Sequence, residues 1–105
     1  MAYQELEEFN LAIGDFNKAI ELDSDYLDVY ISNAICKNKI KDYKGALIDY
    51  SNAIRLDSSN AESYQASGLI KAILYDDSGA CLGFKKAKSL YSSNDIDELI
   101  RKYCK

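Results

Sequence analysis

Apolar and small residues recur along this chain at steps of three and four, the spacing that places side chains on one face of an α-helix. The pattern is clearest where Ala46 is followed by Tyr50, Ala53 and Leu56. The polar pair at residues 41–42 interrupts it and separates this stretch from the helical pattern before it. Strands have no place in such a pattern, so we predict an all-α chain built of short helices.

The same pattern returns with a fixed period along the chain. The segment DFNKAIELDS at residues 15–24 is repeated as DYSNAIRLDS at residues 49–58. Five columns keep the same or a similar residue in three copies: Ala12, Ala46 and Ala80; Phe16, Tyr50 and Phe84; Ala19, Ala53 and Ala87; Leu22, Leu56 and Leu90; Ser24, Ser58 and Ser92. A period of about 34 residues with helical spacing predicts stacked helix–turn–helix units.

These units resemble the tetratricopeptide repeat, which has aromatic residues at positions 4 and 24, small residues at positions 8, 20 and 27, and often proline at position 32. The matching residues are Tyr30, Ala34, Ala46, Tyr50 and Ala53 in one unit, and Tyr64, Gly68, Ala80, Phe84 and Ala87 in the next. Serine stands at position 32. The resemblance implies an all-α, right-handed α-solenoid with a C-terminal capping helix and close helix packing at Gly68. It does not imply a particular function.

We predict a single domain over residues 1–105 that begins within a repeat. Counting back one full period from Leu27 falls before the first residue, so residues 1–26 hold only the second half of a unit. No glycine or proline breaks the segment before residue 11, and residues 3–22 are therefore predicted to form one long helix. Gly14 is a mild weak point in that helix.

Two full repeats at residues 27–60 and 61–94 and a capping helix at residues 95–105 complete the predicted architecture. For the start of the capping helix we predict Asn94 as the N-cap. Ser59 and Glu62 have the spacing of a capping box at the helix that begins near residue 60. Asp76 and Asp77 are predicted to cap the helix that follows them.

Composition narrows the chemistry that this chain can perform. Histidine is absent, which removes histidine-based general bases, catalytic triads and most zinc sites, so we predict no catalytic residue, metal or cofactor. The net charge of −4 argues against a nucleic-acid partner. No apolar run reaches the roughly 18 residues that a membrane span needs. The acidic N-terminus is unlike a signal or transit peptide, and we therefore expect a cytoplasmic protein without membrane partners.

The three cysteines, Cys36, Cys81 and Cys104, form no CxxC pair. We expect buried free thiols that act as small hydrophobes, with a disulfide or a metal knuckle as the alternative. The resemblance places Cys36 and Cys104 at a small buried position of their units and Cys81 at a position that faces the core. Cys104 lies near the end of the chain and is the cysteine with the better prospect of being reactive.

In tetratricopeptide arrays the first helix of each unit lines a concave groove that holds peptides, through positions 2, 5, 9, 12 and 13. The resemblance places these residues in the groove: Asp28, Ile31, Ile35, Asn38 and Lys39, then Glu62, Gln65, Leu69, Ala72 and Ile73, with Leu99 and Tyr103 from the final helix. One subgroup clamps chaperone carboxylates with lysine and asparagine at positions 5 and 9, which this chain lacks there. We predict an apolar groove for a hydrophobic peptide or amphipathic helix of a partner, the alternative being unused surface.

The first helix suggests a different function, a self-assembling scaffold. In this architecture a second helix packs against two first helices, and the N-terminal helix has only one of them. Four of its apolar residues are predicted to lack cover within the chain: Leu6, Phe9, Ile13 and Phe16. An exposed apolar patch favours an interface, here a closed homodimer, although residues 1–24 carry six acids and one base. The alternative is a monomer whose first helix shifts to bury its own stripe.

Overall fold

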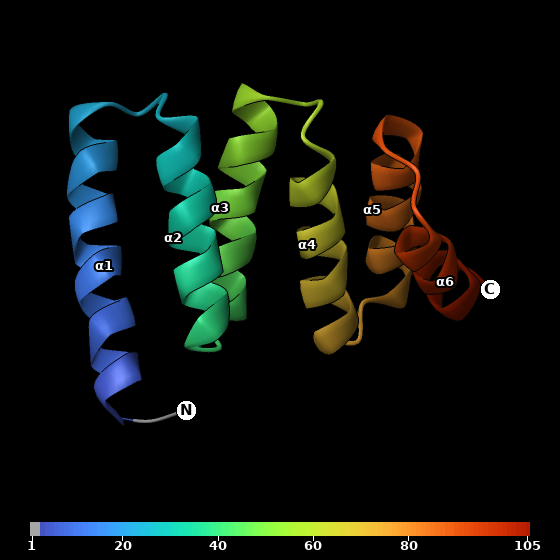
Figure 1. Cartoon of the computed structure of the whole chain (residues 1–105), viewed down its shortest axis with the longest axis horizontal. Coiled ribbons are helices and arrows are strands. Elements are labelled where there is room, and N and C mark those ends of the chain that lie inside the picture. The colour runs from blue at the N-terminus through green and yellow to red at the C-terminus, as the bar shows by residue number, and fades with distance from the viewer. Residues whose placement is uncertain (1–2) are drawn as a thin grey trace. The chain divides into compact units, whose positions relative to one another are not determined.

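The computed structural model describes residues 3–105, and every regular element in that range is an α-helix (Figure 1). The six helices are α1 (Tyr3–Leu22), α2 (Leu27–Lys39), α3 (Tyr43–Leu56), α4 (Ala61–Ile73), α5 (Asp77–Leu90) and α6 (Asn94–Tyr103). The long first helix has the predicted bounds. Residues 1 and 2 of the predicted half-repeat lie outside the described range.

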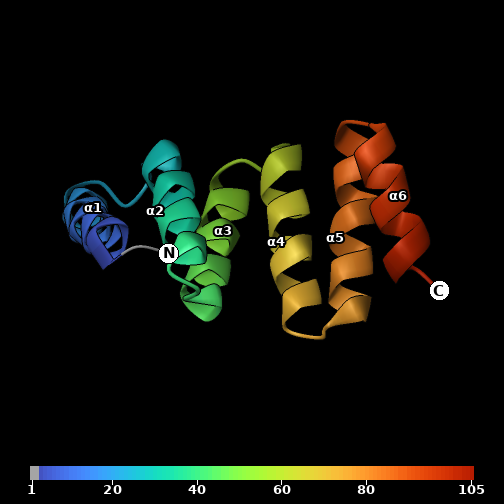
Figure 2. The same cartoon turned by 60° about the horizontal axis from the view of Figure 1, so that its bottom comes forward.

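The chain forms two compact units, divided between Leu56 and Asp57. In the first unit α1, α2 and α3 pack in sequence order, each antiparallel to the next (Figure 1). In the second unit α4 and α5 are antiparallel neighbours, and α6 returns along α5 at an angle (Figure 2). The predicted single domain over residues 1–105 and its repeat boundary at residue 60 stay predictions.

The repeated small and aromatic positions form the core of both units. In the first unit Ala34, Ala46 and Ala53 are completely buried beside Tyr30 and Tyr50. In the second unit the same columns contribute buried alanines at positions 80 and 87 and the buried ring at position 84. These small residues let paired helices approach closely while the aromatic rings fill the remaining space.

The predicted close approach at Gly68 is confirmed. A Cβ atom added at Gly83 on α5 would lie 3.3 Å from the Cα of Gly68 on α4 and 3.0 Å from the carbonyl oxygen of Tyr64. Side chains at these two positions would push α4 and α5 apart. The glycine pair therefore sets the distance between the two helices.

The turn inside each helical pair is built the same way in both units. Lys41 and Tyr75, at equivalent positions of successive repeats, adopt left-handed backbone conformations with φ of 66° and 65°. The aspartates that follow them accept hydrogen bonds from the backbone N–H of Gly45 (3.1 Å) and Gly79 (2.9 Å). A Cβ at either glycine would meet that carboxylate, so the aspartate side chain would have to shift to admit it. The predicted capping by Asp76 is thus confirmed, whereas Asp77 is not a cap but the first residue of α5.

Two predicted N-cap residues are wrong by one position, although the helix expected near residue 60 begins at Ala61. Asn60 caps α4, because its side-chain oxygen accepts from the backbone N–H of Ser63 at 3.1 Å, while the Ser59 hydroxyl donates to Asp57 instead of forming a capping box. For α6 the cap is Ser93, whose hydroxyl oxygen accepts from the backbone N–H of Ile96 at 3.2 Å. The cap must be the extended residue before the helix, and at position 94 the backbone is already helical.

Candidate functional site

The predicted groove residues of the first unit lie along one face of α2. Their steps of three and four residues place them on a common stripe. Ile35, at its centre, is 41% exposed, and Asp28 and Lys39 are exposed near its two ends. Ile31 and Asn38 are half-buried between them. The buried core residues of the unit lie on the opposite face of α2. Ile35, at the centre of the stripe, is therefore not needed for packing within the unit.

A matching stripe follows α4 in the second unit. Leu69 and Ile73, one helical turn apart, are 41% and 50% exposed and form continuous apolar surface. Glu62 is exposed at the start of the helix, and Gln65 and Ala72 are half-buried. The stripe is therefore apolar toward its C-terminal end and acidic at its N-terminal end.

The two predicted groove residues of α6 are half-buried. The Tyr103 ring lies 5.7 Å from the Phe84 ring, measured between centroids, and so packs against α5. Tyr103 also lines a hollow together with Cys81, Leu82 and Cys104. Its contribution to a peptide groove stays a prediction.

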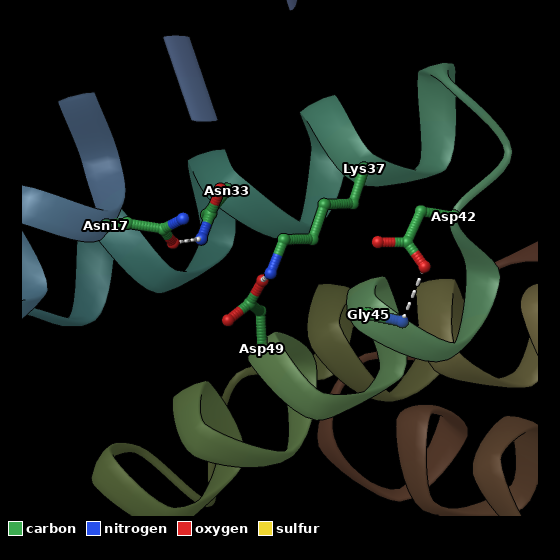
Figure 3. A network of polar contacts seen from close by, with 6 residues as sticks. All are labelled: Asn17, Asn33, Lys37, Asp42, Gly45 and Asp49. Carbon is green, nitrogen blue, oxygen red and sulfur yellow. Dashed lines mark hydrogen bonds and ion pairs between the residues drawn. The ribbon is translucent and has the colours of Figure 1, made fainter. Parts of the chain in front are cut away.

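A polar network joins the three helices of the first unit (Figure 3). Lys37 on α2 forms an ion pair with Asp49 on α3 at 2.8 Å, and their side chains are only 17% and 7% exposed. The side-chain amide of Asn33 donates to the side-chain oxygen of Asn17 on α1 at 3.0 Å. Lys37 had no predicted partner. The available signal was its place in the helical spacing of Tyr30, Ala34 and Ile40, where it is the one charged residue.

Burial dominates the electrostatics of this network. It raises the pKa of the Asp49 carboxyl above its ordinary value, while the Lys37 ammonium acts in the opposite direction and the negative charge of Asp42 adds to the rise. A carboxylate in this setting depends on its cation. The ion pair thus holds α2 to α3 behind the exposed stripe.

The prediction of three buried free thiols is wrong. Cys81 on α5 and Cys104, directly after α6, form a disulfide with a Cα–Cα distance of 5.0 Å, because α6 returns along α5. All three cysteines are half-buried rather than buried. Cys36 is free, and burial raises the pKa of its thiol. A separation of 23 residues with no motif concealed the pairing in the sequence.

The predicted self-association residues lie on α1, which packs against α2. Leu6 is exposed, whereas Phe9, Ile13 and Phe16 are half-buried. Leu11, which is 66% exposed on the same helix, was not among the predicted residues. Leu6 and Leu11, with Glu7 and Asn10 between them, line an open hollow of about 270 Å³.

Within residues 3–105, no group of three or more histidine, cysteine or acidic side chains is arranged to hold a metal ion. Over the same range, no helix combines the length and the apolar character needed to cross a membrane.

Comparison with known proteins shows the fold. No protein-family model and no curated protein matches the sequence. The chain is similar in structure to the Yersinia enterocolitica type III secretion chaperone SycD, solved with a peptide of the translocator YopD (TM-score 0.87, 13% identity, 93% of this chain and 81% of that chain). It is also similar to the second TPR domain of human RPAP3, solved with an HSP70 peptide (TM-score 0.84, 22% identity, 94% of this chain and 83% of that chain).

A third similar structure is the first TPR of Spaghetti (RPAP3), bound to an HSP90 peptide (TM-score 0.85, 18% identity, 97% of this chain and 82% of that chain). All three are tetratricopeptide-repeat domains or share their fold, and each was solved with a peptide. The predicted all-α class of helical repeats is thereby confirmed. At these identities the likeness establishes the fold, and function rests on the site residues.

Proposed function

We propose that this chain, which has the tetratricopeptide-repeat fold, is a non-enzymatic module that binds a peptide or helix of a partner protein. The observation that carries the proposal is the exposure of Ile35, Leu69 and Ile73 on the first helix of each helical pair. The core is formed by the opposite faces of these helices, so the exposed area of the three side chains does not contribute to it. Peptides bound to three proteins of the same fold support the proposal.

The chemistry of the stripes selects the kind of peptide. Full burial of one isoleucine or leucine side chain contributes about 1.5–3 kcal/mol, and here roughly half of each remains to be covered. Two or three apolar anchors from the ligand are therefore needed for useful affinity. Because aliphatic side chains stand at Ile31, Ile35 and Leu69, we propose an apolar segment or amphipathic helix as ligand, rather than an acidic C-terminus.

Replacing Ile35 and Leu69 by aspartate is expected to weaken binding at least tenfold, which corresponds to about 1.4 kcal/mol. The cause is an uncompensated carboxylate at each anchor point. The ligand is a peptide selected by display against the wild-type chain, and its affinity is measured by fluorescence anisotropy. Each single variant is expected to lose part of the affinity.

Ile48→Asp provides the matched control, since Ile48 lies on α3 and is 63% exposed outside both stripes. It makes the same chemical change and is expected to leave the affinity unchanged. Circular dichroism establishes that all variants remain helical. Undiminished binding by the folded double variant, or an equal loss in Ile48→Asp, would contradict the proposal.

We propose self-association through α1 as the second candidate function, supported by the exposure of Leu6 and Leu11 beside the hollow between them. Sedimentation of the full chain should then show a dimer that forms with increasing concentration. Since residues 1–24 carry a net charge of −5, raising the salt to 1 M, where charges are screened beyond about 3 Å, should strengthen the dimer. Leu11→Asp should return it to the monomer. A monomeric mass at every concentration and salt would reject this function.

A further inference from the structure

The Cys81–Cys104 disulfide lies in the wall of an open hollow of about 440 Å³ in the second unit. The hollow is lined by Asp77, Ser78, Cys81, Leu82, Tyr103, Cys104 and Lys105. Both cysteines are half-buried, so neither is sealed inside the protein. The volume admits a small molecule to the side of the disulfide that faces solvent.

Besides the disulfide, α6 is held by contacts near its start and at its end. The helix has 10 residues, which is too short to be stable on its own. Ile96 is buried near its start, and Asp97 forms an ion pair with Lys88 of α5 at 2.8 Å, partly exposed to solvent. At its end, Tyr103 packs against Phe84, and the disulfide follows directly. The C-terminal end of α6 is therefore held by the contact of Tyr103 with Phe84 and by the disulfide.

We propose that this hollow is a thiol-exchange site, where a low-molecular-weight thiol opens the Cys81–Cys104 disulfide and releases the C-terminal end of α6. In the first step the incoming thiolate forms a bond to Sγ of Cys104. The Cys81–Cys104 bond breaks, and its electron pair passes to Sγ of Cys81, which takes a proton from water. A second thiolate then attacks the mixed disulfide, displacing Cys104 as a thiolate that is protonated in turn. Two thiol molecules are oxidised to one disulfide, and the protein disulfide is reduced.

Attack at Cys104 is favoured by its place in the chain. It comes after the last residue of α6 and next to Lys105, whose positive charge offsets the negative charge of Asp77 in the same hollow. Because Cys104 lies outside the helix, an adduct on it need not fit among helical residues. The same adduct on Cys81, inside the second turn of α5, would have to fit between two packed helices.

The test uses the full chain, purified without reductant, with glutathione as the thiol. Titration with a thiol reagent is expected to find one free thiol per chain before reduction, at Cys36, and three after it. Glutathione should form a mixed disulfide at Cys104, identified by mass spectrometry of its peptides. Hydrogen exchange should then accelerate in α6 and remain slow in α5.

Thermal unfolding gives an independent measurement. Complete reduction is expected to lower the melting temperature by about 10 °C or more, because a closed loop of 23 residues is released in the unfolded chain. Cys36→Ser is the matched control and should show the same decrease. Cys104→Ser should melt near the reduced wild-type chain and respond to no reductant.

Three outcomes would overturn the proposal. The first is three titratable thiols before reduction, and the second is a glutathione adduct confined to Cys36. The third is unchanged hydrogen exchange in α6 after reduction. Wild-type chain in its oxidised and reduced forms suffices for each of these measurements, so poor folding of a variant does not affect them.

Discussion

Replacing Lys37 by methionine is expected to reduce the free energy of unfolding by about 3–5 kcal/mol at neutral pH. The substitution keeps the length and apolar stem of the side chain and removes only the ammonium. Asp49, whose side chain is 7% exposed, is then left as a buried carboxylate without its cation. Urea unfolding followed by circular dichroism measures the change.

The loss should depend on pH in a defined direction. Burial raises the pKa of Asp49 above the ordinary 3.8, and removal of Lys37 should raise it further. A carboxyl with a raised pKa in the folded state binds more protons there than in the unfolded chain. Its contribution to stability is therefore fully present below pH 3.8 and is lost as the pH rises through the folded-state pKa. Lys37→Met should thus differ little from wild type in acid and most at neutral pH.

Two controls separate the loss of the ion pair from the loss of a lysine. Lys71→Met makes the same change at the equivalent position of the next repeat, where Gly83 stands in place of Asp49, and it should cost little. The double variant Lys37→Met with Asp49→Leu removes both charges and should recover most of the stability. Equal losses in Lys37→Met and Lys71→Met would show that the pair does not hold α2 to α3.

The parts of the fold that were predictable are those that repeat. The same packing requirement is seen three times in the sequence, as alanine at positions 12, 46 and 80 and as an aromatic residue at positions 16, 50 and 84. This repetition identifies the core residues and the helical pairs. Helix starts were less predictable, because neighbouring residues such as Ser93 and Asn94 have side chains that can both serve as caps. The backbone conformation selects between them, and local sequence does not specify it to one residue.

The features that were missed are those that break the period. Asp49 pairs with Lys37, whereas Gly83 occupies the corresponding place in the next unit. Cys81 forms a disulfide, whereas its counterpart is Leu47. Each of these contacts depends on how two particular helices pack. A comparison of equivalent positions in successive repeats shows what the repeats share, so it does not reveal a contact that only one repeat makes. Three of the predicted groove residues, Ile35, Leu69 and Ile73, are exposed on α2 and α4, and the groove and its ligand stay proposals.

Two glycine-to-alanine substitutions in helices are expected to change stability in opposite directions. At Gly68 an added Cβ would lie 2.7 Å from the Cε1 atom of Phe84 and 3.2 Å from the carbonyl oxygen of Ala80. The Phe84 ring is fully buried and also packs against Tyr103, so it cannot move without disturbing α6. Overpacking of this kind should cost about 1–3 kcal/mol.

At Gly14 an added Cβ would meet no atom within 4 Å, and the residue lies exposed inside α1. Alanine there should stabilise the chain by about 1 kcal/mol, because it has the higher helix propensity and restricts the unfolded chain. Thermal unfolding should therefore show a higher melting temperature for Gly14→Ala and a lower one for Gly68→Ala. Adding Phe84→Leu to Gly68→Ala should cost less than the two single losses combined, since the smaller side chain removes the collision. Additive losses in that double variant, or a Gly68→Ala chain as stable as wild type, would mean that a Cβ atom at Gly68 is accommodated without a collision with Phe84.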